Sequence, residues 1–145
     1  MLQQQRVLRV ITKIFLPFIL LFGLYVQFHG DFGPGGGFQA GVIFAAGIIL
    51  YALVFGLDAA RSALPISWTR QLIPLGVLLY GGVGVANLFL GGNFLDYDSL
   101  SPQHPSHGQH LGILLVELGV GITVAATMVT LFYAFAGRER QKQRP

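Results

Sequence analysis

Long apolar runs, interrupted by short polar segments, dominate the chain and predict its fold. A helix that crosses the roughly 30 Å hydrocarbon core of a bilayer needs about 20 predominantly apolar residues, and four runs approach or reach that length. We therefore expect an all-α membrane protein with four transmembrane helices, forming a single integral membrane domain over residues 1–145. The expected spans cover residues 7–28, 38–57, 72–90 and 111–136.

The basic residues all fall on one side of these four spans. The connections on the other side, residues 29–37 and 91–110, contain aspartates but no Lys or Arg. Because cytoplasmic loops of membrane proteins are enriched in Lys and Arg, this distribution predicts that the N- and C-termini are both cytoplasmic. The nine basic residues are Arg6, Arg9, Lys13, Arg61, Arg70, Arg138, Arg140, Lys142 and Arg144.

Composition supports a membrane protein and excludes several other classes. Charged residues make up 10% of the chain, against about 25% in ordinary soluble domains. The net charge of +3 does not indicate a nucleic-acid partner, because the basic residues lie at the ends of apolar segments rather than in a separate domain. The chain contains no Cys, which excludes disulfides, thiolate metal sites and thiol catalysis within it.

A glycine-rich segment, residues 29–41, links the first two expected spans. A phosphate-binding loop would need a preceding strand and a Gly-Lys-Ser/Thr ending, and the sequence offers neither. Consecutive glycines instead permit backbone conformations that other residues avoid, and they let neighbouring helices approach closely. We therefore interpret Pro34, Gly35, Gly36 and Gly37 as a structural bend. Irregular backbone at membrane depth must be covered by protein or face water, so partner subunits are candidates for covering it.

Small residues recur at intervals of four in the second and fourth expected spans. Gly41 and Ala45 share one face of the second span, and Gly121 and Ala125 share one face of the fourth. Stripes of this kind allow close packing of helices in a membrane, so we expect these four residues at helix–helix contacts.

Tyr80 and Asn87 lie seven residues apart and therefore on one face of the third expected span. Either side chain can donate or accept a hydrogen bond across a helix interface. A polar contact with a neighbouring subunit and ordinary packing within the chain are both open for this pair.

Glu117 is the one charged residue within the fourth expected span. It follows Leu111 by six residues, roughly 9 Å along a helix, and therefore lies inside the hydrophobic zone. An ionised carboxylate is costly there unless it is paired or hydrated, and acids within the membrane commonly mark ion or proton pathways. A protonated glutamate held by a structural hydrogen bond is the alternative.

His29 and Asp31 lie at the outer boundary of the first span. A histidine and a carboxylate at this position fit two roles equally well. They can help protons or cations to enter a path, or they can cap helix ends in contact with water.

Three histidines, His104, His107 and His110, are spaced three apart in the connection before the fourth span. Because histidine is a common zinc ligand, three histidines in one short segment raise the question of a zinc site. Pro102 and Pro105 argue against a regular helix that would present the three imidazoles on one face. We therefore assign neither a metal nor another cofactor to this chain and leave the role of the histidines open.

Two segments of the sequence resemble those of a known family. The first is His29-Gly30 followed by Pro34-Gly35-Gly36-Gly37-Phe38 and Gly41, and the second is Glu117-Leu118-Gly119-Val120. Through them nearly the whole chain is similar to the MnhB/MrpB family, whose members are small subunits of the multisubunit Na+/H+ antiporters of the Mrp or Mnh type. Related members of that family can carry Asp at the position of Glu117. The stretch at residues 102–110 does not belong to the family pattern.

The resemblance implies a small, multi-pass subunit of a heteromeric complex in the bacterial cytoplasmic membrane. Its partners would be the other Mrp/Mnh-type subunits, the larger of which resemble the antiporter-like subunits of respiratory complex I and would supply proton channels. Sodium, or potassium in related systems, would leave the cell as protons enter, without an organic cofactor. The chain would thus be a transporter subunit rather than an enzyme. Within this scheme we hypothesise that Glu117, helped by His29 and Asp31, lines an outer cation or proton route.

Two other functions are compatible with the same residues. MnhB-like modules resemble parts of membrane-bound hydrogenase complexes, in which ion pumping is coupled to electron transfer and the metal centres lie in partner subunits. A purely structural subunit, whose glycine loop and small-residue stripes only hold larger channels together, is the second alternative.

Overall fold

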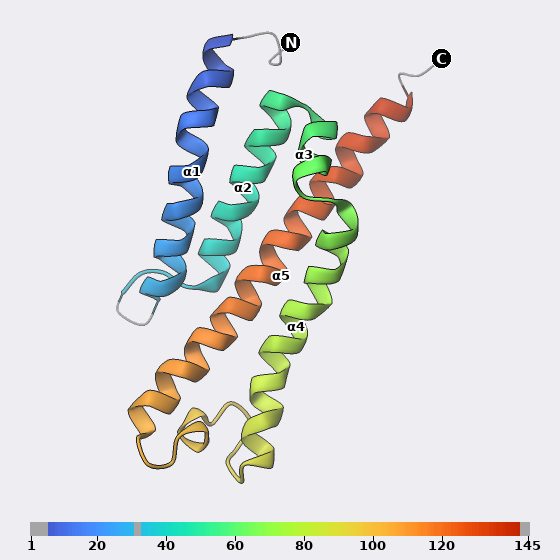
Figure 1. Ribbon diagram of the computed structural model, residues 1–145. Coiled ribbons are helices and arrows are strands. Elements are labelled where there is room, and N and C mark those ends of the chain that lie inside the picture. Colours follow the sequence, from blue (N-terminus) through green and yellow to red (C-terminus); the bar gives the residue numbers. More distant parts are fainter. Residues whose placement is uncertain (1–5, 31–32, 143–145) are drawn as a thin grey trace.

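The computed structural model describes residues 6–30 and 33–142, and every regular element within these ranges is helical. Asp31, one of the residues expected in the cation or proton route, lies outside the described residues. The elements, labelled in Figure 1, are α1 (Arg6–His29), α2 (Gly37–Phe55), α3 (Leu57–Ala63), α4 (Ile66–Phe89), the 3-10 helix η2 (Tyr97–Leu100) and α5 (Pro105–Lys142).

Four of these helices, α1, α2, α4 and α5, are long and apolar enough to cross a membrane. The expected all-α fold with four potential spans is confirmed. Helix α1 begins and α5 ends at the same end of the molecule (Figure 1), as an even number of spans requires. Many large apolar side chains on α1 and α4 are exposed, which suits surfaces that meet lipid or another protein. The cytoplasmic location of the termini stays a prediction.

The connection between the second and third spans contains a short helix, α3, that the hydrophobic pattern does not predict. Helix α2 stops at Gly56, whose φ of 100° lies in the left-handed region that glycine tolerates best. The Gly56 N–H still donates to the Ala52 carbonyl at 2.9 Å, so the helix end is satisfied. Pro65 then precedes α4, which begins earlier than the expected residue 72 and continues through Pro74.

Helix α5 also begins earlier than expected, at Pro105 rather than near residue 111. Proline is tolerated at the first position of a helix, because its missing N–H would have no partner there and its φ already suits the helix. Pro105 therefore starts the helix. His107 and His110 therefore lie within a regular helix, whereas His104 precedes it, so one helix does not present all three imidazoles.

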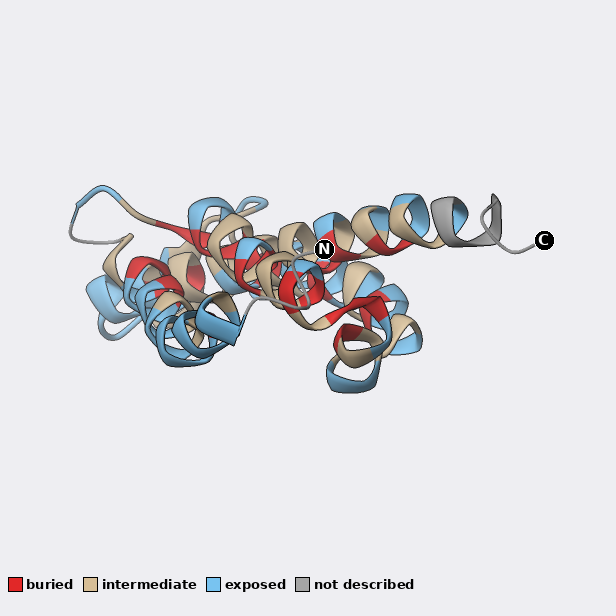
Figure 2. Cartoon of the chain, turned by 90° about the horizontal axis from the view of Figure 1, so that it is seen from above, coloured by how far each residue is buried: buried red, intermediate tan, exposed pale blue. Residues whose placement is uncertain are grey.

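Helix α5 runs diagonally through the molecule and forms its central support (Figure 1). Its largest contact surfaces are with α4 and with α2, whereas α1 packs mainly on α2 and touches α5 over a short stretch. Viewed from above, buried residues lie along the inner faces of the helices and exposed residues around the outside (Figure 2). The spans thus form an open fan around α5, with α1 and α2 on one side and α4 on the other.

A cluster of buried apolar residues lies near the end where α1 begins and α5 ends. Tyr133 of α5 is fully buried there, and its hydroxyl donates to the Leu64 carbonyl at 3.2 Å. The Arg61 side chain of α3 donates to the Tyr133 carbonyl, also at 3.2 Å. These bonds fix α3 and its connection to α4 against α5. The buried members of the cluster are Ala45, Ala52, Leu57, Ala60, Val129 and Tyr133.

Candidate functional site

The side chain of Glu117 extends from α5 into the glycine-rich bend between α1 and α2. A β-carbon placed on Gly30 would lie 2.5 Å from each carboxylate oxygen of Glu117. A β-carbon on Gly36 would lie 3.0 Å from one of the same oxygens. Two glycines from different parts of the bend therefore face one carboxylate, at distances that leave little or no room for a side chain.

The bend also packs against the backbone of α5. A β-carbon on Gly37 would collide with the backbone carbonyl of Glu117, so α2 begins in direct backbone contact with α5. Gly36 has a φ of 118°, a conformation that residues with a side chain rarely adopt. Its N–H donates to the Val26 carbonyl at 3.0 Å and so satisfies an acceptor in the last turn of α1. The bend is thus covered by this chain's own α5 over Gly30, Gly36 and Gly37.

A cleft of about 320 Å³ opens beside the carboxylate. Its lining combines the bend, the first residues of α2 and one face of α5. Glu117 is half-buried and is the one charged residue in this lining. The lining residues are Gly35, Gly36, Gly37, Phe38, Gln39, Val116, Glu117 and Val120.

His29 ends α1 and lies next in sequence to Gly30. Its ring stacks on Tyr25, with the ring centroids 5.0 Å apart. Its Nε2 lies 3.3 Å from the position of a β-carbon on Gly33. The structure thus places His29 in the same bend as the cradle around Glu117.

Gln27 is a polar residue of this region that no motif in the sequence marks. Its side chain is 5% exposed, and its Oε1 lies 2.7 Å from the position of a β-carbon on Gly121, one helical turn from Glu117. Among the described residues its Nε2 is buried without a hydrogen-bond partner. The signal available in the sequence is a lone amide within the apolar run of α1.

Gly41 and Gly121 meet where α2 crosses α5. A β-carbon on Gly41 would lie 2.7 Å from the Gly121 carbonyl oxygen, so the two backbones approach as closely as small residues allow. Ala45 is fully buried in the apolar cluster, and Ala125 lines a neighbouring cavity. This crossing fixes the height of Glu117 relative to the glycine bend.

A second close crossing, between α4 and α5, is not predicted by the sequence. A β-carbon on Gly76 would lie 2.6 Å from the Gly119 carbonyl oxygen, and one on Gly119 would lie 2.7 Å from the Gly76 carbonyl oxygen. The Thr123 hydroxyl, beside this contact, donates to the Gly119 carbonyl at 2.9 Å. Helix α5 therefore has two backbone-contact faces, one toward α2 and one toward α4.

With this geometry in view, the comparison with known proteins decides the family. Residues 7–130 match the model of a family described as "Domain related to MnhB subunit of Na+/H+ antiporter". The chain belongs to this family. Two relatives bear the name "Putative antiporter subunit mnhB2", one from Staphylococcus haemolyticus (strain JCSC1435) and one from Staphylococcus aureus (strain Newman). Each is 36% identical over 133 residues, which cover 90% of this chain and 94% of the relative.

In this MnhB-related chain, Tyr80 and Asn87 share a face of α4 that is turned partly toward the chain's own connection. Asn87 is fully buried, and its Oδ1 accepts a hydrogen bond from the Ser99 hydroxyl at 3.1 Å. Tyr80 is 38% exposed, and its backbone N lies 2.9 Å from the position of a β-carbon on Gly119. Because Ser99 belongs to η2, Asn87 contacts η2 of the same chain. Tyr97 belongs to η2 as well; burial raises the pKa of its hydroxyl, and the nearby Tyr80 raises it further.

The three histidines lie around the start of α5. His107 and His110 are within the helix, and the rings of His104 and His107 are 5.5 Å apart. Within residues 6–30 and 33–142, no group of three or more His, Cys, Asp or Glu side chains is arranged to hold a metal ion. The three histidines lie at the end of the molecule where α4 connects to α5.

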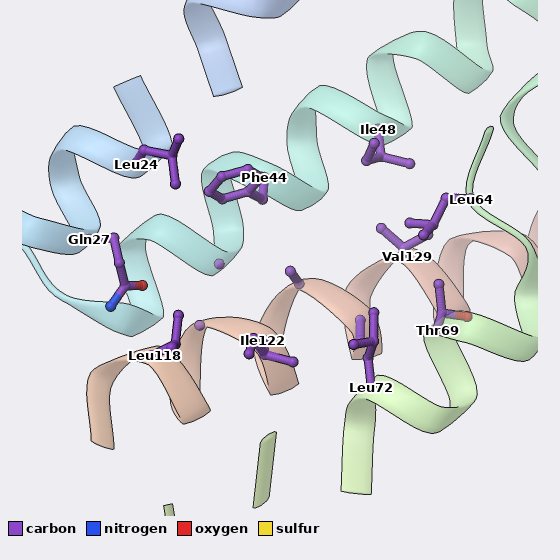
Figure 3. A pocket seen from close by; sticks show the side chains of 14 residues that line it. Leu24, Gln27, Phe44, Ile48, Leu64, Thr69, Leu72, Leu118, Ile122 and Val129 are labelled. Atoms are coloured by element: carbon purple, nitrogen blue, oxygen red, sulfur yellow. The ribbon is translucent and has the colours of Figure 1, made fainter. Parts of the chain in front are cut away.

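A second, almost entirely apolar cavity of about 310 Å³ lies over α5 between α2 and α4 (Figure 3). Gln27 lies at one end of it and Thr69 at the other, and Figure 3 shows leucines, isoleucines, a valine and Phe44 between them. Thr69 is fully buried, and its hydroxyl donates to the Ile66 carbonyl at 3.0 Å. The cavity offers few groups that could replace the water around an ion, so the polar site is confined to the region of Glu117 and Gln27.

Proposed function

We propose that this chain is a small membrane subunit of a heteromeric Na+/H+ antiporter and that Glu117 lies on its cation or proton route. Its partners are the other Mrp/Mnh-type subunits, and its place is the bacterial cytoplasmic membrane. Sodium efflux, or potassium efflux in related systems, is coupled to proton uptake by the assembly. The chain is a transport component and carries no organic cofactor.

The observation that carries this proposal is the glycine cradle around a carboxylate within a span. The first two spans approach the carboxylate of Glu117 through Gly30 and Gly36, while a cleft leaves it open on another side. The close contacts with Gly30 and Gly36 hold the side chain in one place. A carboxylate fixed beside an opening can take up and release a proton or contact a hydrated cation.

The neighbouring residues support a route that begins at this cleft. His29 ends the helix that leads into the bend, and a histidine side chain can act in proton transfer. Asp31 follows in the same connection and belongs to the proposal through its position in the sequence. On the inner side, Gln27 of α1 places its amide beside Gly121, one turn along α5 from Glu117, and the apolar cavity follows. Ion transfer beyond that point would therefore pass to partner subunits.

The test replaces Glu117 in the complete antiporter complex. Glu117→Gln keeps the size of the side chain and one acceptor oxygen but removes its charge, and we expect it to abolish most sodium-driven proton movement in everted membrane vesicles. Glu117→Asp retains the carboxylate and should keep part of the activity. Asp98→Asn is the matched control, because Asp98 is exposed and lies outside the cleft.

Co-purification of all subunits with each variant separates transport from assembly. An assembled Glu117→Gln complex with normal exchange would overturn the role of Glu117 and favour the structural alternative. A complex that fails to assemble with Glu117→Gln, but assembles with Glu117→Asp, would assign the carboxylate to subunit contact instead of the ion route.

A further inference from the structure

Away from the Glu117 cleft, the end of the molecule where α1 begins carries a basic pocket. The pocket has a volume of about 370 Å³ and lies between the first turns of α1 and the last residue of α2. Arg6, Arg9 and Lys13 line it together with Val10, and Phe55 closes it from α2.

Helix periodicity explains why three cations meet in this pocket. Residues separated by three, four and seven positions share one face of a helix, and this spacing joins Arg6, Arg9, Val10 and Lys13. The guanidinium carbon of Arg9 lies 5.3 Å from the centre of the Phe55 ring, and the Lys13 ammonium lies 5.8 Å from it. Both cations therefore lie close to the same aromatic ring.

The charges in the pocket are not balanced by its walls. Every ionisable side chain that lines it is basic. The side chains of Arg9 and Lys13 both have cation–π contacts with Phe55. An aromatic face attracts a cation without accepting its N–H groups strongly, so these contacts with Phe55 leave the N–H donors of both side chains able to bind an anion.

The position of the pocket indicates which anion it receives. Lys13 lies about two turns into a membrane-spanning helix, and the side chains of Val10 and Ile14 beside it are 57% and 56% exposed. Trp68, 63% exposed near the start of α4, has the character of an interfacial aromatic anchor at the same end. A phospholipid places its phosphate beside basic residues at this depth and its acyl chain against apolar helix faces.

We propose that Arg6, Arg9, Lys13 and Phe55 form a binding site for the phosphate group of an anionic phospholipid, whose acyl chain lies along the exposed apolar face of α1. The site binds phosphate through charge-assisted N–H···O bonds, with the guanidinium able to offer two parallel donors. It is separate from the cleft at Glu117 and does not depend on the proposed transport role.

The experiment titrates the purified full chain in mild detergent with phosphatidylglycerol or with zwitterionic phosphatidylcholine, and counts bound lipids by native mass spectrometry. Arg9→Gln/Lys13→Gln removes two charges from the pocket. Arg70→Gln/Arg138→Gln is the matched control, because both arginines are exposed and neither lines the pocket. At about 1 kcal/mol per basic residue near an anionic surface, the pocket variant should bind phosphatidylglycerol roughly 30-fold more weakly. The control variant should retain wild-type binding.

Four results would overturn the site. Equal weakening in the pocket variant and the control would mean diffuse surface charge, and equal binding of the two lipids to the wild type would remove the preference for an anionic headgroup. Inorganic phosphate that displaces phosphatidylglycerol, and binds the pocket by itself with similar affinity, would assign the site to free phosphate. A charge-preserving variant, Arg9→Lys/Lys13→Arg, should keep the preference for phosphatidylglycerol, and its loss would contradict a site based on these two charges.

Discussion

Both carboxylate oxygens of Glu117 lie 2.5 Å from the position that a β-carbon would occupy on Gly30. One residue belongs to α5 and the other follows α1, so this contact joins the last span to the first connection. Gly36, with its φ of 118°, closes the same space from the start of α2. Glycine is therefore needed in this bend for two reasons. It allows the turn to form, and it leaves space for the Glu117 side chain.

Gly30→Ala should displace the Glu117 carboxylate and destabilise the chain. Forcing a methyl group into a filled space commonly costs about 1–3 kcal/mol, and the loss should appear as a lower midpoint of SDS-induced unfolding. Because Asp is one methylene shorter than Glu, Gly30→Ala/Glu117→Asp should recover part of that loss. Gly81→Ala is the control, since apart from its own helix backbone and its chain neighbours nothing lies within 4 Å of its added β-carbon. Additive effects of the two substitutions would contradict the contact.

The sequence predicts the four spans well because apolar runs of bilayer length are a direct consequence of hydrocarbon thickness. It does not predict α3, which is seven residues long, too short to show as a span. Nor can it predict that Gly30 faces Glu117. Helical periodicity tells which residues share a face of one helix, whereas the height at which two helices cross depends on packing along their whole length.

The same limit applies to the crossing of α4 and α5. The sequence predicts contacts for Gly41 and Gly121 because each belongs to a stripe of small residues, and they meet each other in the structure. Gly76 is a lone glycine in its part of α4, so no stripe marks it. Its importance follows only from the position of Gly119 opposite it.

Gly76→Ala should destabilise the chain more than a glycine substitution elsewhere in α4. The added methyl group would meet the Gly119 carbonyl, which belongs to the backbone and cannot move aside as a flexible side chain can. We expect a loss of about 1–3 kcal/mol and a wider separation of α4 from α5. Gly82→Ala is the control. Gly82 lies on the same helix and its added β-carbon would meet open space, so this substitution should be neutral or slightly stabilising. Similar unfolding midpoints for the two variants would contradict the close crossing.

Tyr133→Phe should weaken the attachment of α3 and its connection to α4. The substitution keeps the buried ring but removes the hydroxyl that donates to the Leu64 carbonyl at 3.2 Å. The expected cost is about 0.5–1.5 kcal/mol, with faster amide hydrogen exchange near residues 60–66. Tyr51→Phe, which changes another half-buried tyrosine at the edge of the same cluster, should leave exchange in this segment unchanged.

Gln27 allows the demands of folding to be separated from those of transport. Within the described residues its Nε2 is buried without a partner, and a buried donor in that state costs about 1–3 kcal/mol. Gln27→Leu should therefore stabilise the isolated chain by an amount of that order, measured as a higher unfolding midpoint in detergent. In the antiporter complex the same variant should reduce sodium-driven proton movement, because it removes the polar side chain of α1 that lies beside Gly121, one turn from Glu117. Leu24→Met, one turn earlier on α1 and in the same cavity lining, is the control and should change neither property strongly. A destabilised Gln27→Leu chain would show that the amide does have a partner, such as a bound water, and would then assign Gln27 to the structure of the site.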